Sequence, residues 1–371
     1  MKVKSLSLEN YRNIKSLSLT FDEKLNIIYG DNAQGKTNLI EAISLFSGEK
    51  SFRSVRDRQL VKLDEQKARL QMIYETKVRE NNMQIEINGT RNTTLNGLPF
   101  KVSEDLTVKF HTVVFSPTHL SLIKDGPEKR RAFLDNCICQ ISPNYTNLLT
   151  QYDRALFQRN SLLKSPALKI MTENQVRMAF DVWNASLASS GSMIYKMRLR
   201  YLNELNKYAS EIYSLITSNR EEMQTYYLST IFENDETDVY KIKEIYETAL
   251  RENVEDDLRV GYTQLGINRD DFGVKINSIS AKNFASQGQQ RSAVLALKFS
   301  QCQILENALD ESPVILLDDV MSELDKTRQD YILNRVKGMQ VFLTCCDKDD
   351  IKGLSGGKLF YIKNGEIENK E

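Results

Sequence analysis

Two short motifs about 250 residues apart constrain the fold of this chain more than any other feature. The first, Gly30 to Thr37, reads GDNAQGKT and fits the phosphate-loop pattern GxxxxGK[ST] at every fixed position. The second, Ser286 to Gln290, reads SQGQQ and is followed by the apolar run Val314 to Leu317 and two aspartates. A phosphate loop alone indicates only nucleotide binding. The combination predicts a particular kind of α/β ATPase.

The phosphate loop has the flanking structure that its chemistry requires. An apolar strand, Leu25 to Tyr29, is expected before it and a helix from Thr37 after it, so that backbone N–H groups surround an anion at the start of the helix. Lys36 is expected to neutralise the β- and γ-phosphates, and the Thr37 hydroxyl to bind Mg²⁺. The residues predicted to bind ATP here are Gly30, Asp31, Asn32, Ala33, Gln34, Gly35, Lys36, Thr37 and Asn38.

Asp318 and Asp319 follow the run Val314 to Leu317, which predicts a buried parallel strand with carboxylates at its C-terminal edge. Adjacent side chains on a strand point to opposite faces, so we expect different tasks for the two. Asp318 is predicted to hold Mg²⁺ through water, and Asp319 to orient or deprotonate the attacking water, with Lys36 as the third catalytic residue. The alternative is an ordinary turn after a core strand.

Ser286 precedes a segment with helical character, Ser292 to Leu309, and has the chemistry of a helix N-cap. Gly288 allows a phosphate to approach the free N–H groups of the helix. The simple alternative is a helix start that only needs its cap. A second anion site beside a complete phosphate loop makes better sense if it contacts the γ-phosphate held by another subunit.

At 371 residues the chain exceeds the size at which one hydrophobic core usually stays single. Helical periodicity between Pro127 and Asp257 predicts an inserted, mainly helical lobe, whereas the sequence before and after it alternates short strands with turns and helices. We expect residues 1–120 and 261–371 to form one ATPase lobe and residues 121–260 the second. The predicted N-terminal strands are residues 3–8, 17–21, 25–29, 70–74 and 83–87, with hairpin turns at residues 88–89 and 96–97.

Charge and composition exclude several functions. With 50 basic and 50 acidic side chains, the chain has no uniformly basic coat, so any contact with nucleic acid requires a local patch. No apolar run approaches 18 residues, and none of the five cysteines forms a CxxC pair. A reduced, cytoplasmic protein without a structural metal or a membrane segment is expected. The candidate DNA patches are Arg53, Arg56 and Arg58, and Lys124, Lys129, Arg130 and Arg131.

The order of these motifs resembles the ABC-type ATPase heads of the SMC-like group, and most closely the RecF family of bacterial recombination and repair proteins. The resemblance covers nearly the whole chain and includes several further motifs. These are Leu8 to Asn13, Ser51 to Arg53, Val114 to Pro117, Arg130 to Asp135, Gln158 to Asn160, Arg269 to Asp271, Phe284 to Arg291 and Ser322 to Asp325.

The resemblance implies an ATP- and Mg²⁺-dependent homodimer with ATP between two head-to-tail subunits. Ser286, Gln287, Gly288 and Gln289 of one subunit would face the phosphate loop of the other, and Arg12 would reach the phosphates. It further implies weak DNA-stimulated ATP hydrolysis, binding to duplex or gapped DNA, and cooperation with RecO and RecR in loading RecA during recombinational repair and the SOS response.

Some segments depart from the family pattern, and one rival function has the same core motifs. Thr118-His119 replaces acidic residues, Gly266-Ile267-Asn268 replaces Gly-Pro-His, and Thr344-Cys345-Cys346 stands where a γ-phosphate-sensing His or Thr is expected. The alternative function is the ATPase subunit of an ABC-type transporter. Such subunits carry a Leu-Ser-Gly-Gly-Gln signature and a shorter helical insertion. A purely architectural SMC-like head would need a longer coiled coil, and a nuclease would need more chain after Asp325.

Overall fold

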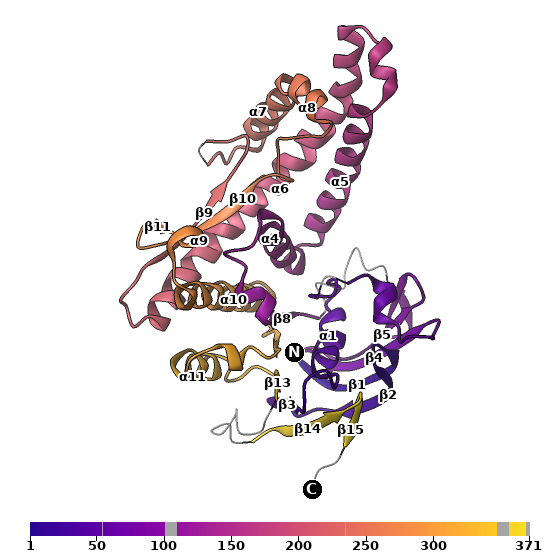
Figure 1. The fold of residues 1–371 in the computed structure, drawn as a ribbon, viewed down its shortest axis with the longest axis vertical. Coiled ribbons are helices and arrows are strands. Elements are labelled where there is room, and N and C mark those ends of the chain that lie inside the picture. Colours follow the sequence, from indigo (N-terminus) through magenta and orange to yellow (C-terminus); the bar gives the residue numbers. More distant parts are fainter. Residues whose placement is uncertain (54, 101–109, 234, 347–355, 369–371) are drawn as a thin grey trace. The chain divides into compact units, whose positions relative to one another are not determined.

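The computed structural model describes residues 1–53, 55–100, 110–233, 235–346 and 356–368 (Figure 1). The chain forms two compact units. Unit 1 comprises Met1–Leu122, Tyr208–Glu222 and Ala285–Glu371, and unit 2 comprises Ile123–Lys207 and Met223–Phe284. Within the described ranges, no helix has both the length and the apolar character needed to cross a bilayer.

A six-stranded sheet in unit 1 carries the phosphate loop. Its order is β15-β14-β3-β13-β12-β8, and all neighbours are parallel except β14 and β15. Every residue of β8, β12 and β13 is buried, as expected for strands covered on both faces. Because parallel strands share one C-terminal edge, the loop after β3 and the aspartates after β12 lie at the same edge. The strands are β3 Leu25–Tyr29, β8 Thr112–Phe115, β12 Val314–Leu317, β13 Val341–Cys345, β14 Lys358–Lys363 and β15 Glu366–Glu368.

The second sheet of unit 1 is antiparallel, in the order β2-β1-β4-β5-β6-β7. Asn88-Gly89 and Asn96-Gly97 connect β5 to β6 and β6 to β7, and Gly89, Asn96 and Gly97 have positive φ, so both predicted hairpin turns are confirmed. One apolar core joins this sheet to α1 and the parallel sheet through residues such as Leu6, Ile43 and Leu316. The strands are β1 Lys2–Tyr11, β2 Ile14–Thr20, β4 Ala68–Glu75, β5 Glu80–Ile87, β6 Arg91–Leu95 and β7 Leu98–Phe100.

The helices of unit 1 include α1, which begins at the phosphate loop, and α10, which begins at the Ser286–Gln290 motif. The α-helices are α1 Lys36–Leu45, α3 Pro117–Leu120, α10 Gln287–Leu309 and α11 Lys326–Arg335, with short 3-10 helices η1 Asp57–Leu60 and η3 Met321–Glu323. Helix α1 begins one residue before the predicted position. Helix α10 begins five residues earlier than predicted, because Ser286 rather than a later residue is its N-cap.

Unit 2 is mainly helical, as predicted, but it also contains a three-stranded sheet in the order β11-β10-β9. Its elements are α4 Pro127–Ile141, α5 Pro143–Leu163, η2 Pro166–Ile170, α6 Glu173–Ile216, β9 Met223–Leu228, α7 Val239–Glu252, α8 Val254–Val260, β10 Asp271–Ile276, β11 Ile279–Ser280 and α9 Ala281–Phe284. The long helix α6 starts in unit 2, and its residues from Tyr208 onward belong to unit 1.

The compact units differ from the expected boundaries of 121–260 and 261–371 in two places. Residues 261–284 belong to unit 2, because β10 pairs with β9 along its whole length, from Asp271 opposite Leu228 to Ile276 opposite Met223. Residues 208–222 belong to unit 1. The pairing of β9 with β10, which are far apart in sequence, therefore sets the C-terminal boundary of unit 2. The prediction from helical periodicity ended this unit too early, at residue 260.

Several charged motif residues in unit 2 are buried structural groups. The side chains of Arg159 and Asp257 are 0% exposed and lie 2.6 Å apart, and Arg159 also donates to Asn184. Arg130 is 3% exposed and forms a two-bond pair with Asp271. The prediction that Arg130 belongs to a DNA-binding patch is therefore wrong, because its charge is already neutralised inside the unit.

Candidate nucleotide-binding site

The phosphate loop has a backbone that only small residues permit. Gly30, Ala33 and Gly35 have φ values of 147°, 64° and 117°. A Cβ atom on Gly30 would lie 2.4 Å from the Ile362 carbonyl oxygen, and one on Gly35 would lie 3.1 Å from Asn13 Oδ1. The loop thus turns its backbone N–H groups toward one concavity at the start of α1, which suits an anion.

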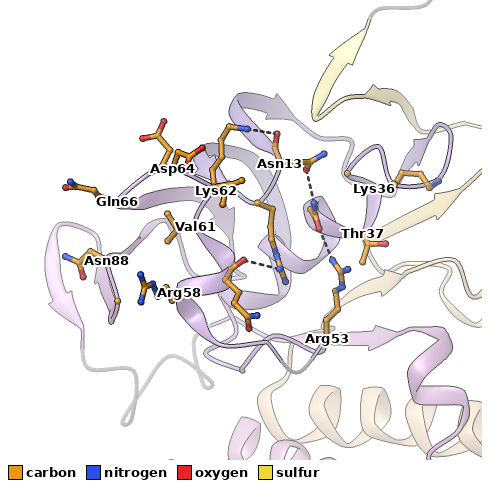
Figure 2. A pocket seen from close by; sticks show the side chains of 18 of the residues that line it. Asn13, Lys36, Thr37, Arg53, Arg58, Val61, Lys62, Asp64, Gln66 and Asn88 are labelled. Atoms are coloured by element: carbon orange, nitrogen blue, oxygen red, sulfur yellow. Dashed lines mark hydrogen bonds between the residues drawn. The ribbon is translucent and has the colours of Figure 1, made fainter.

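A cavity of about 1210 Å³ opens beside this loop (Figure 2). Seven of the residues predicted to bind ATP line it: Arg12, Asn32, Ala33, Gly35, Lys36, Thr37 and Asn38. Asp319 also lines it, and its other end is formed by residues 58–59 and 61–66 with Asn88 and Gly89. The cavity is large enough for a nucleotide, whose phosphates would lie at the loop.

The three predicted loop residues that do not line the cavity support its backbone. Lys36 Nζ donates to the carbonyl oxygens of Gly30 and Asp31 at 2.6 and 3.1 Å. The Gln34 carbonyl accepts from the Asn13 side chain at 3.2 Å and from the Gly365 N–H at 2.9 Å. The lysine that would bind phosphate is therefore held over the loop, within the cavity.

The structure brings Thr37 and Asp318 together, although they are 281 residues apart in sequence. Thr37 Oγ1 donates to Asp318 Oδ1 at 2.9 Å, so a hydroxyl and a carboxylate converge at the start of α1. This is the donor set that Mg²⁺ takes in phosphate-loop enzymes. Burial raises the pKa of Asp318 to about 6, the Thr37 hydrogen bond opposes this rise, and the neighbouring charge of Asp319 adds to it.

The prediction that Asp318 and Asp319 point to opposite faces is wrong. Strand β12 ends at Leu317, and Asp319 adopts a left-handed conformation with φ of 49°. Both carboxylates therefore approach one hydroxyl, Thr344 Oγ1, at 3.1 Å from Asp318 and 3.3 Å from Asp319. The same oxygen accepts the Asp319 N–H at 2.8 Å. Thr344 thus fixes the relative position of the two acidic groups.

Cys346 lies next to the phosphate loop. It belongs to the segment Thr344-Cys345-Cys346, in which a phosphate-sensing residue is expected. Its thiol donates to Asn32 Oδ1 at 3.2 Å, and Lys36 Nζ lies 3.7 Å from its Sγ. Thr344, by contrast, is 1% exposed and is occupied by the two aspartates. Of this segment, it is the Cys346 side chain that faces the loop residues.

Arg12 lies at the cavity but is bound to a residue that the sequence did not single out. Its Nε and Nη2 donate to the two carboxylate oxygens of Glu41 at 2.9 and 2.7 Å. Glu41 is 0% exposed and also accepts from the hydroxyls of Tyr11 and Ser51. One buried carboxylate therefore joins the N-terminal motif, α1 and the Ser51–Arg53 motif. A single acidic residue inside the apolar run Leu39–Ile43 was the available signal.

A second polar chain runs along the cavity wall (Figure 2). Asn38 Nδ2 donates to Asn13 Oδ1 at 2.8 Å, and Arg53 Nη1 donates to Asn38 Oδ1 at 2.9 Å. The Asn38 side chain thus links neighbouring protein groups, which leaves its backbone as the part available to a nucleotide. Arg53 and Arg58, proposed for a DNA patch from the sequence, both line the nucleotide cavity.

The start of α10 has the predicted capping geometry. The Gln289 N–H donates to Ser286 Oγ at 3.2 Å, and the Ser286 N–H donates to Gln289 Oε1 at 2.8 Å, which forms a capping box. Ser286 and Gln287 are exposed. None of the described residues that line the nucleotide cavity belongs to Ser286–Gln290. One subunit therefore contains both motifs without bringing them into one cavity.

We call Ser286–Gln290 the signature motif and α10, which begins there, the signature helix. The parallel sheet, the phosphate loop and the capped signature helix define an ABC-type ATPase head of the SMC-like class. An Smc head bound to a domain of ScpA shares this fold, with a TM-score of 0.56 and 16% identity over 99% of this chain and 96% of that one. Residues 2–360 also match the family described as RecF/RecN/SMC N terminal domain.

Much closer relatives are DNA replication and repair proteins named RecF. Those of Clostridium acetobutylicum and Clostridium kluyveri are 37% and 38% identical, over 99% of this chain and 99% of each relative. A solved structure of the recombination mediator protein RecF with ATP, from the RecFOR pathway, has a TM-score of 0.91 and 35% identity over 100% of this chain and 98% of that one. The chain belongs to the RecF family and is a DNA replication and repair ATPase. These relatives do not favour the transporter alternative.

Proposed function

We propose that this protein is an ATP-dependent DNA-binding switch in which ATP joins two copies head to tail. The observation that carries the proposal is the separation of two formed half-sites within one subunit. The phosphate loop lies in its cavity, whereas the exposed, capped start of α10 does not line it. The positive N-terminal end of a long helix such as α10 favours an anion, and in the dimer this anion is the γ-phosphate bound by the partner subunit.

Within each site the residues have separate tasks. Lys36 neutralises the β- and γ-phosphates, and the Thr37 hydroxyl with Asp318 holds Mg²⁺, which when bound spreads the charge that develops on the phosphates. Asp319 lines the cavity and is held by Thr344, so its carboxylate orients or deprotonates the attacking water. Ser286 and Gly288 of the second subunit complete the site.

Such a shared site makes the dimer depend on the γ-phosphate. Both subunits bind the γ-phosphate, so its loss on hydrolysis removes contacts between the two subunits and weakens the dimer. DNA bound by the dimer is then released with ADP, and DNA that favours the dimer stimulates slow hydrolysis. The exposed Lys124 and Lys129 remain candidates for phosphate contacts. The RecFOR pathway named for the RecF–ATP structure supports DNA, RecO and RecR as partners. Duplex or gapped DNA is the substrate that we propose.

Ser286→Arg tests the shared site. The added side chain blocks a partner's phosphate at the start of α10 but does not change the cavity of its own subunit. We expect wild-type ATP affinity, no ATP-dependent dimer in sedimentation velocity, and no ATP-dependent binding to gapped DNA. An unchanged ATP-dependent dimer would contradict the proposal. Duplex and single-stranded DNA, with and without ATP, give the substrate preference in the same series.

A further inference from the structure

Arg328 connects the start of α10 to the loop that precedes α11. Its Nε donates to Ser292 Oγ at 2.8 Å and its Nη2 to the Gly288 carbonyl oxygen at 2.9 Å, so the guanidinium binds two groups one helical turn apart. Its Nη1 pairs with Asp325, which is also the N-cap of α11 and accepts the Arg328 N–H at 3.1 Å. One side chain thus joins the signature motif to Asp325.

The absence of a side chain at Gly288 leaves room for this contact. A Cβ atom at residue 288 would lie 3.2 Å from Arg328 Nη2, which is tighter than most Cβ contacts, so the guanidinium would have to shift by a few tenths of an ångström. A second arginine makes a parallel link, since Arg291 donates to the Glu323 carboxylate at 2.7 Å. On the other side of the motif, Gln289 donates to Glu221 Oε1 at 2.7 Å. The capped helix start is therefore braced from two directions.

We propose that Arg328 is a positioning residue for ATP hydrolysis that acts on the site of the partner subunit. It holds Gly288 and Asp325 in one rigid arrangement, so that the signature helix and the loop Ser322–Asp325 meet a partner's nucleotide together. This inference rests on the shared site proposed above. Because Arg328 touches neither the phosphate loop nor any described residue lining the nucleotide cavity, its role is separable from nucleotide binding by its own subunit.

A planar guanidinium is needed for this task. Arginine presents several N–H donors in a fixed fork and can bind three acceptors at once, whereas a lysine ammonium has no such geometry. Arg328→Gln removes the charge and the fork, and Arg328→Lys keeps only the charge. Arg335 on the same helix offers a matched control, because its Nη2 donates to Gln303 of α10 at 2.7 Å, far from the signature motif.

The test compares Arg328→Gln, Arg328→Lys and Arg335→Gln. We expect each to bind a fluorescent ATP analogue within about twofold of wild type. We expect kcat at saturating ATP to fall about tenfold or more in both Arg328 variants and to stay within about twofold in Arg335→Gln, because a charge-assisted contact that aligns the site is lost only in the former. Unchanged kcat in Arg328→Gln, or an equal loss of nucleotide affinity, would overturn the proposal.

Mixed dimers separate a trans role from a general structural defect. In a dimer of Arg328→Gln with Lys36→Ala, one site carries both changes and the other carries neither, so turnover rises above the sum of the two proteins measured alone. The mixture of Ser286→Arg with Lys36→Ala is the reference for a shared site. Recovery in the reference but not with Arg328→Gln would overturn the role of Arg328. Recovery in neither mixture would overturn the shared site and the inference with it.

Discussion

Replacing Asp318 with asparagine should remove a pH-dependent cost that the metal-free protein carries. Asp318 is 5% exposed and accepts the Thr37 hydroxyl at 2.9 Å. Burial raises the pKa of this carboxyl from the ordinary 3.8 to about 6, more than the hydrogen bond from Thr37 lowers it. Without a cation, the folded state therefore holds a carboxylate that would be more stable in water.

The sign and size of the effect follow from linkage. Because the pKa in the folded state lies above that of the unfolded state, the contribution of Asp318 to stability is complete below pH 3.8 and is lost as the pH rises through about 6. One pKa unit corresponds to about 1.4 kcal/mol, so the full loss amounts to about 3 kcal/mol. An amide side chain cannot ionise, so the Asp318→Asn variant should not show this loss.

Urea unfolding of both proteins, with a chelator and without nucleotide, measures the difference from about pH 4 to about pH 8. We expect the stability of Asp318→Asn relative to wild type to increase across this range, with most of the change below about pH 6.5. Asp22→Asn is a control without this change, because the N–H groups of Lys24 and Leu25 lower the pKa of Asp22 below its ordinary value of 3.8. The contribution of Asp22 to stability therefore changes below the measured range, and the stability of Asp22→Asn relative to wild type should stay nearly constant from about pH 4 to about pH 8. A constant difference between Asp318→Asn and wild type would refute the reasoning.

Three further substitutions test the cavity. Lys36→Ala should abolish ATP binding in equilibrium titrations, because it removes the ammonium group that contacts the β- and γ-phosphates, and retained affinity would contradict the assignment. Asp319→Asn should bind ATP normally but slow single-turnover hydrolysis and prolong the dimer, so normal turnover would exclude Asp319 as the base. Glu41→Ala should lower the free energy of unfolding by about 3 to 5 kcal/mol, because Arg12 and Tyr11 lose a buried partner, and a loss below about 1 kcal/mol would contradict that account.

Features that depend on local backbone geometry could be predicted from the sequence. Strand β3 has the predicted bounds, Leu25–Tyr29, and Ser286 caps its helix as expected. The prediction for Asp318 and Asp319 failed because it assumed that the strand continues, whereas the left-handed conformation of Asp319 turns both carboxylates toward Thr344. Nothing in the residue types around Asp319 indicates that conformation.

Groups that act through distant contacts could not be predicted in the same way. Arg130 has the sequence context of an exposed cation. Only the packing of α4 against β10 in the structure shows that Asp271 neutralises its charge. Arg328 is likewise an ordinary helix residue until Gly288, 40 residues earlier, is placed beside it. Glu41 left one trace, since a carboxylate inside an apolar helical run is costly unless several donors meet it.

The same contrast explains why the phosphate loop identifies an ATPase but does not show how the site is assembled. Loop residues such as Gly30 and Gly35 are required by the conformation of their own backbone. Their spacing can therefore be recognised in the sequence of any phosphate-loop protein. The positions of Glu41, Thr344 and Arg328 matter because of their hydrogen bonds, and each of the three bonds to a residue in a segment that is distant in sequence. The proposed sharing of a nucleotide between two subunits requires those segments to keep fixed positions during binding. Glu41 and Arg328, which help to set these positions, lie outside the ATPase motifs, and a buried or multiply hydrogen-bonded charge is the physical sign by which they are recognised.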